Sequence, residues 1–196
     1  MNKENCVIAN NDEWLQTPSP FDVIDEDMKI IIIFFVFHIP VEGVSARGKS
    51  LKEYGWGKKS KTNDFKELKR RLIEFGEMNE KYFVCEDNFE KLKSALTKNQ
   101  LIDFPKDIEN QKVVFKKDKS SMIDSLIFHI RNAFAHGRVA LYKNGQYIVM
   151  EDINPKSKVI SARMILKKET LMKWIYIIRK GPLAEENELK KELKME

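Results

Sequence analysis

One segment of the chain changes from helical to strand periodicity at a single glycine, and this feature constrains the fold more than any other. Apolar residues recur at helical spacing between positions 122 and 134: Met122, Ile123, Leu126, Ile127, Ile130, Ala133 and Phe134. Ser120 or Ser121 is suited to cap the start of this helix. Gly137 is suited to the left-handed residue that ends a helix. We therefore expect an amphipathic helix that ends beside His136.

The residues that follow this helix predict a small antiparallel sheet. Asn144-Gly145 is a strong signal for a tight hairpin, and it separates two apolar segments, 139–142 and 146–152. A second turn leads to a third predicted strand over 159–166. A final helix is expected from about Lys168 to Lys180, because its apolar residues return to helical spacing.

The apolar run Ile30–Phe37 is the strongest in the chain. It is far shorter than the roughly 20 residues that span a membrane. The run fits a buried helix or a central strand, and the acidic residues before it and Pro40 after it favour a helix. Further helices are predicted to begin near Phe65 and to run from Asn88 to Thr97, the second with Asp87 as its cap.

Length and composition fit one domain with short appendages. Hydrophobic residues make up 42% of the chain and charged residues 33%, which suits a folded core. We predict an irregular leader over residues 1–20, a helical domain over 21–182 and a charged tail over 183–196. Cys6 and Cys85 are the two cysteines, so a disulfide framework is not expected. The chain is predicted to be cytoplasmic.

Positive charge is concentrated in two segments, although the net charge is only +5. Residues 47–71 contain ten Lys and Arg against three acidic residues, and residues 155–180 contain eight against one. Such stripes attract a polyanion, although a solvated Lys-rich surface has the same composition. Within the first segment, Lys58, Lys59 and Lys61 are predicted RNA contacts.

The helix end before Gly137 carries residues suited to catalysis. His136 can exchange a proton near neutral pH, and Arg131 can hold a phosphate with its planar fork. Asn132 can orient the imidazole or a phosphate oxygen. Together these groups suit RNA cleavage by the ribose 2′-hydroxyl, which requires neither a metal nor a cofactor. The structural alternative is that Arg131 and His136 only stabilise the negative end of the helix dipole.

The segment Arg131-Asn132-Ala133-Phe134-Ala135-His136 resembles the Arg-x4-His signature of HEPN domains, including the polar residue directly after the arginine. Its position at the end of an amphipathic helix, before a glycine, a hairpin and a final helix, also resembles that family. Residues 132–137 and 147–152 are similar to HEPN-type proteins of plasmids, phages and bacterial defence islands. The resemblance is specific over about residues 120–180.

The resemblance implies a mainly α fold, a HEPN-like helical bundle with a small antiparallel hairpin or meander before the last long helix. It implies a homodimer in which two motifs form one composite endoribonuclease site. His136 would be the catalytic histidine, Arg131 the arginine that contacts phosphate and Asn132 the orienting residue. His129 and Arg138 are further predicted RNA contacts, although a core-edge position without function is the alternative for His129. A role as a toxin or anti-phage effector, with an antitoxin or defence-system partner, follows from the same resemblance.

One position departs from a well-known toxin branch of the family. That branch has a tyrosine two residues after the motif histidine, where a partner nucleotidyltransferase can modify it, whereas this chain has Arg138. Tyr142 is no clear substitute, so control by that route is not expected. The alternative function is a catalytically inactive HEPN-like module for dimerisation or RNA binding.

Overall fold

The computed structural model describes residues 6–8, 24–44, 48–57, 64–103, 108–154 and 156–193. These residues form a five-stranded sheet in the order β1-β2-β5-β4-β3. The strands are β1 (Phe83–Glu86), β2 (Lys112–Lys116), β3 (Val139–Tyr142), β4 (Tyr147–Ile153) and β5 (Ile160–Lys167). β1 and β2 are parallel, and the three remaining neighbouring pairs are antiparallel. The sheet is therefore mixed.

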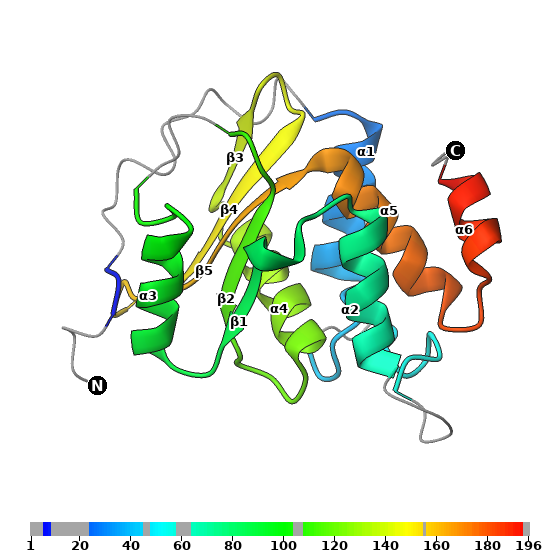
Figure 1. The fold of residues 1–196 in the computed structure, drawn as a ribbon, viewed down its shortest axis with the longest axis horizontal. Helices are drawn as coiled ribbons and strands as arrows, with labels where there is room; N and C mark the ends of the chain where they lie inside the picture. The colour runs from blue at the N-terminus through cyan, green and yellow to red at the C-terminus, as the bar shows by residue number, and fades with distance from the viewer. Residues whose placement is uncertain are drawn as a thin grey trace.

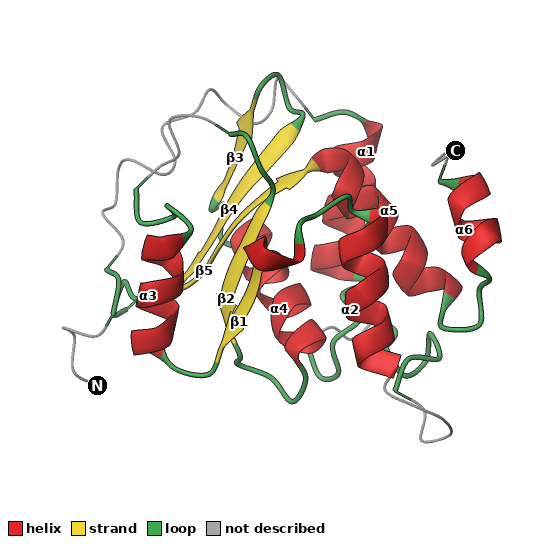
Figure 2. Cartoon of the chain, in the orientation of Figure 1, coloured by secondary structure: helices red, strands yellow, loops and turns green. Residues whose placement is uncertain are grey.

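Helices lie on both sides of the sheet (Figures 1 and 2). One side carries α3 (Phe89–Lys98), and a short 3-10 turn, η4 (Glu80–Tyr82), precedes β1. The other side carries α1 (Glu26–Ile32), its π-helical continuation η3 (Ile33–Phe37), α2 (Asp64–Phe75), α4 (Met122–Ala135) and α5 (Lys168–Lys180). The last helix, α6 (Glu186–Glu192), lies at the end of the molecule remote from the sheet.

The predicted fold class, a mainly α helical bundle with a small antiparallel meander, is wrong. The meander is present as β3, β4 and β5, but β1 and β2 extend it into a mixed sheet, so the fold is α/β. α3 connects the parallel strands β1 and β2, as such crossovers require. β2 gives no alternating pattern because Val113 is buried on the α4 side of the sheet and Val114 on the α3 side. Its short apolar run between lysines therefore resembles neither an amphipathic strand nor a helix.

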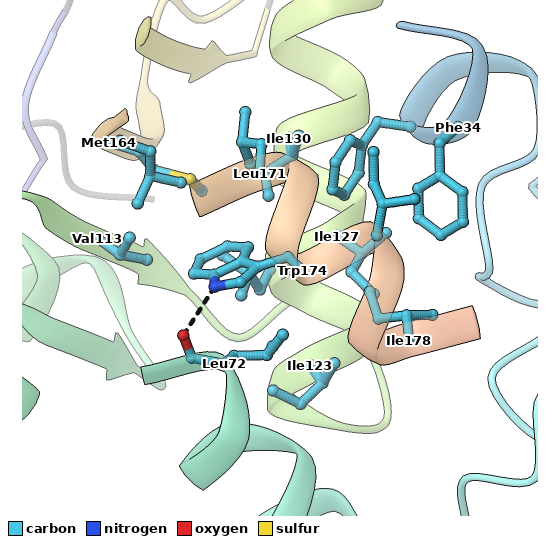
Figure 3. Close-up of a cluster of buried hydrophobic side chains, with 14 of the residues drawn as sticks. Phe34, Leu72, Val113, Ile123, Ile127, Ile130, Met164, Leu171, Trp174 and Ile178 are labelled. Atoms are coloured by element: carbon cyan, nitrogen blue, oxygen red, sulfur yellow. Dashed lines mark hydrogen bonds between the residues drawn. The ribbon is translucent and has the colours of Figure 1, made fainter. Parts of the chain in front are cut away.

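The larger core lies between the sheet and helices α1, α2, α4 and α5. Figure 3 shows Ile123, Ile127 and Ile130 of α4 converging on Trp174 of α5. The Trp174 Nε1 donates a hydrogen bond of 2.8 Å to the carbonyl oxygen of Leu72, which joins α5 to α2. Because the apolar side of α4 faces this core, its polar side faces away from it.

The apolar run 30–37 is helical, as predicted, and ends before Pro40. Asp25 caps the helix by accepting a 3.0 Å hydrogen bond from the Met28 backbone N–H. The run is not buried on all sides. Ile30, Ile33 and Phe37 are 41%, 49% and 59% exposed, and their spacing places them along one side of α1 and η3.

The chain after α5 folds back onto α2. Leu189 of α6 is buried, and the Arg71 guanidinium donates a 3.0 Å hydrogen bond to the Ala184 carbonyl oxygen. Most of the predicted leader, residues 1–20, lies outside the described residues, as do Lys58, Lys59 and Lys61. Among the residues that are described, no helix is both long and apolar enough to cross a membrane.

Candidate active site on helix α4

Both ends of α4 are fixed by local capping. Ser121 accepts a 2.9 Å hydrogen bond from the Asp124 backbone N–H, as one of the two predicted caps. At the other end, Gly137 has a φ of +64°, where a side chain would be strained. Its N–H donates to Phe134, and the Arg138 N–H donates to Ala133 at 2.8 Å. These two bonds form a Schellman motif, which ends the helix directly after the predicted catalytic residues.

The structure brings two of the three predicted catalytic residues into contact. Arg131 and Asn132 occupy the last turn of α4, and the Arg131 Nη1 donates a 3.1 Å hydrogen bond to the Asn132 Oδ1. The Arg131 Nε is buried and has no hydrogen-bond partner among the described residues. A buried donor without an acceptor costs about 1–3 kcal/mol. The guanidinium therefore has one unsatisfied donor, which lies inside the protein surface.

His136 occupies the C-cap position of α4, and its side chain is exposed. Its backbone N–H donates to the Asn132 carbonyl oxygen at 3.0 Å, so the backbone is held while the imidazole is accessible. Within the described part of the chain, no hydrogen bond joins the imidazole to Arg131 or Asn132. Five helical positions separate Arg131 from His136, which turns their side chains roughly 140° apart around the axis. Within one chain, therefore, the side chains of Arg131 and His136 do not point toward a common site.

His129 lies in the interior, as a core histidine. Its side chain is 0% exposed, its Nδ1 lies 2.6 Å from the Asp152 Oδ2, and its Nε2 lies 2.7 Å from the Lys116 carbonyl oxygen. Asp152, on β4, also accepts a 3.1 Å hydrogen bond from the Asn132 Nδ2. A ring with both nitrogens engaged inside the protein has no atom left for RNA. His129 is therefore a core residue that is not placed to contact RNA, contrary to the prediction.

Sequence reasoning did not single out Asp152 as part of this site. It follows Asn132 by 20 residues, and the two side chains meet only because β4 packs against α4. The only signal in the sequence was the pair of acids, Glu151 and Asp152, in a strand that is otherwise apolar. A buried carboxylate requires partners, so such a residue points to a buried polar contact, but not to which one.

The predicted RNA contact Arg138 points elsewhere. Its Nε donates a 3.0 Å hydrogen bond to Glu151, whose carboxylate also accepts from Arg163 at 2.7 Å. Glu151 and Arg163 are 1% and 2% exposed. Burial lowers the pKa of the Arg163 guanidinium, and the charge of Glu151 opposes this. Glu151 and Asp152 are neighbours on β4, so their side chains lie on opposite faces of the sheet. Arg138 is therefore held on the face away from α4.

The loop between β2 and α4 adds positive charge near the exposed side of α4. The Lys119 Nζ lies 3.9 Å from the ring centroid of Phe128, which is partly exposed one turn before Asn132. A cation at this distance is attracted by the aromatic face. Lys117 in the same loop is exposed. The polar side of α4 thus combines a guanidinium, an imidazole, an aromatic ring and lysine charges, which suits a phosphate-bearing ligand.

Comparison with known protein families assigns the chain to one of them. A family model described as HEPN pEK499 p136 matches residues 51–188, which include α2 to α5, the whole sheet and the Arg-x4-His motif. The chain therefore belongs to the HEPN domain family, and within it to the group described by the name HEPN pEK499 p136. No curated protein and no solved structure gives a significant match. HEPN domains are often ribonucleases, so membership supports a nuclease-type, RNA-related function.

Proposed function

We propose that the protein is a metal-independent endoribonuclease whose site is formed by Arg131, Asn132 and His136. The observation that carries this proposal is the end of α4, where an accessible imidazole follows a guanidinium that Asn132 holds and that keeps one donor unused. His136 is accessible for proton transfer to and from a substrate. Arg131 supplies fixed donors for phosphate oxygens, whose negative charge increases in the transition state.

The proposed reaction uses the nucleophile that RNA itself carries. The ribose 2′-oxygen attacks the adjacent phosphorus and loses its proton to a base, while the bond from phosphorus to the 5′-oxygen breaks. The leaving 5′-oxygen takes up a proton, so the electrons and protons balance without water, metal or oxidant. His136 is the proton-transfer group, and the Arg131 guanidinium binds the phosphate during the displacement.

The products provide the first test. Purified protein incubated with single-stranded RNA should yield fragments with a 2′,3′-cyclic phosphate and a 5′-hydroxyl, with and without EDTA. Mass spectrometry of the fragments identifies these ends. An oligonucleotide with 2′-deoxyribose at the cut position should remain intact, because it lacks the nucleophile. RNA that is bound but uncut would instead identify a binding module, and cleavage of the 2′-deoxy substrate would contradict the mechanism.

We further propose that the active form is a homodimer. The stripe formed by Ile30, Ile33 and Phe37 is apolar and exposed, and η3 packs directly against α4. A twofold axis through this stripe would bury it against the same stripe of a second copy, as closed dimers do. It would also bring the two α4 helices near one another, so that Arg131 of one chain and His136 of the other can meet.

The dimer predicts a change in mass for one substitution. Ile33→Asp would bury an unpaired charge in the proposed interface, and we expect dimer dissociation to become easier by more than about tenfold. Light scattering over a concentration series measures this change. Leu183→Asp is the matched control, because Leu183 is 94% exposed and lies outside the stripe. A wild-type protein that is monomeric across the micromolar range would contradict the proposal.

A cellular role as a toxin or anti-phage effector is part of the same proposal. An endoribonuclease without strict substrate recognition would damage cellular RNA, so its activity would require restraint. An antitoxin or another protein of a defence system is the partner that such a role implies.

A further inference from the structure

A series of hydrogen-bonded groups connects the motif arginine to the end of β2. The Arg131 Nη1 donates to Asn132 at 3.1 Å, and the Asn132 Nδ2 donates to the Asp152 Oδ2 at 3.1 Å. The same oxygen lies 2.6 Å from the His129 Nδ1. The His129 Nε2 in turn lies 2.7 Å from the Lys116 carbonyl oxygen at the end of β2. The series joins α4, β4 and β2.

The carboxylate determines which way the Asn132 amide faces. An ionised carboxylate only accepts hydrogen bonds, so it requires the NH2 group of Asn132 to point toward it. The amide oxygen must then point the other way, toward Arg131. With the amide reversed, its NH2 group would meet the guanidinium, which has only donors. Asp152 therefore selects the amide orientation that holds Arg131.

The His129 ring lies between two acceptors, one of which is Asp152. Both ring nitrogens of His129 face acceptors, a carboxylate oxygen and a carbonyl oxygen, and the form with two N–H groups satisfies both. Asp118 is a second acid near the ring, with its Oδ2 at 3.6 Å from the Nε2. Lys116 forms an ion pair with Asp118, which offsets that charge. A buried cation beside a buried anion avoids the cost of either charge alone.

We propose that Asp152 is a positioning residue, which acts through Asn132 to orient the Arg131 guanidinium, and that His129 is its buried counter-ion. This inference rests on the proposed function for its effect on catalysis, but not for its effect on Arg131 itself. It assigns roles to two residues outside the Arg-x4-His motif. Neither touches RNA.

Nuclear magnetic resonance of the free protein tests the positioning without reference to activity. Relaxation of the Arg131 Nε–H should show an ordered group in the wild type, and a more mobile one in Asp152→Ala and Asn132→Ala. Glu151→Gln is the matched control, since Glu151 is also a buried acid on the same strand, and it binds Arg138 and Arg163. It should leave Arg131 ordered. The His129 ring should show both N–H groups at neutral pH, and a single N–H would overturn its role as counter-ion.

Cleavage kinetics test whether Asp152 acts through Asn132. We expect Asp152→Ala to lower kcat by about 10- to 100-fold, because small misplacements of a catalytic group have effects of this size. Asp152→Asn, which keeps an acceptor oxygen, should lose less, and it provides the test if Asp152→Ala fails to fold. In an Asn132→Ala background, Asp152→Ala should lower kcat by no more than about twofold further, since residues in one network are not additive.

The outcomes separate this inference from the proposed function. Independent, multiplicative effects of the two substitutions on kcat would overturn the positioning role, and so would an Arg131 that stays ordered in Asp152→Ala. If the wild type cuts no RNA, but Arg131 becomes mobile in Asp152→Ala, the proposed function is wrong and the positioning role is supported.

Discussion

Replacing His136 by alanine is expected to lower the rate of RNA cleavage by about 10²- to 10⁴-fold, the usual contribution of a placed proton-transfer group. Thermal unfolding should change little. His136 is exposed, and its cap hydrogen bond to Asn132 is made by the backbone N–H, which alanine retains. Removing a charged side chain from an exposed helix C-terminus costs only about 0.3–1 kcal/mol. The readouts are single-turnover cleavage of an RNA oligonucleotide and a melting curve.

His38→Ala is the matched control for this substitution. His38 is also exposed and also occupies the C-cap position of a helical segment, η3, but it lies outside the motif. Its removal should leave cleavage unchanged. Full activity in His136→Ala would end the catalytic assignment. Loss of activity together with loss of folding would favour the alternative, in which the residue serves only the helix end.

The residues that could be located from sequence are those whose structure is determined locally. The helix 122–135, its Ser121 cap and its Gly137 end depend on neighbours within one or two turns, and the structure confirms all three. The same is true of the hairpin at Asn144-Gly145, because the turn itself requires positive φ at both residues. The Arg-x4-His motif lies within about one and a half helical turns, so it too was recognisable as a linear pattern.

The features that were missed depend on residues far apart in the chain. β1 and β2 are short strands whose identity is set by pairing, β1 with β2 and β2 with β5. Asp152 joins the site only through the packing of β4 on α4. The apolar run 30–37 was expected to be buried on all sides, but Ile30, Ile33 and Phe37 remain exposed. The apolar character of a residue does not by itself show whether its own chain or a second chain buries its side chain.

Replacing Arg131 by lysine is expected to lower kcat/KM by about 10²- to 10³-fold, the usual effect of removing one fixed donor that stabilises transition-state charge. Lysine keeps the charge but has no planar fork. Its ammonium has three donors on one nitrogen, but they are not fixed in a plane as the guanidinium donors are, so it cannot hold Asn132 and a phosphate in the same rigid geometry. Arg179→Lys, at an exposed position near the end of α5, should leave cleavage unchanged. Near-normal activity in Arg131→Lys would show that only the charge matters.

The proposed composite site makes a sharper form of this prediction possible. An Arg131→Ala chain retains His136, and a His136→Ala chain retains Arg131, so a mixed dimer holds one of each residue. Because the two side chains of one chain diverge by roughly 140° around α4, the proposed site pairs the arginine of one chain with the histidine of the other. We therefore expect mixing two inactive variants to restore part of the wild-type rate. Native mass spectrometry establishes that mixed dimers have formed, and once they have, an inactive mixture would contradict a site in which each chain contributes one of the two residues.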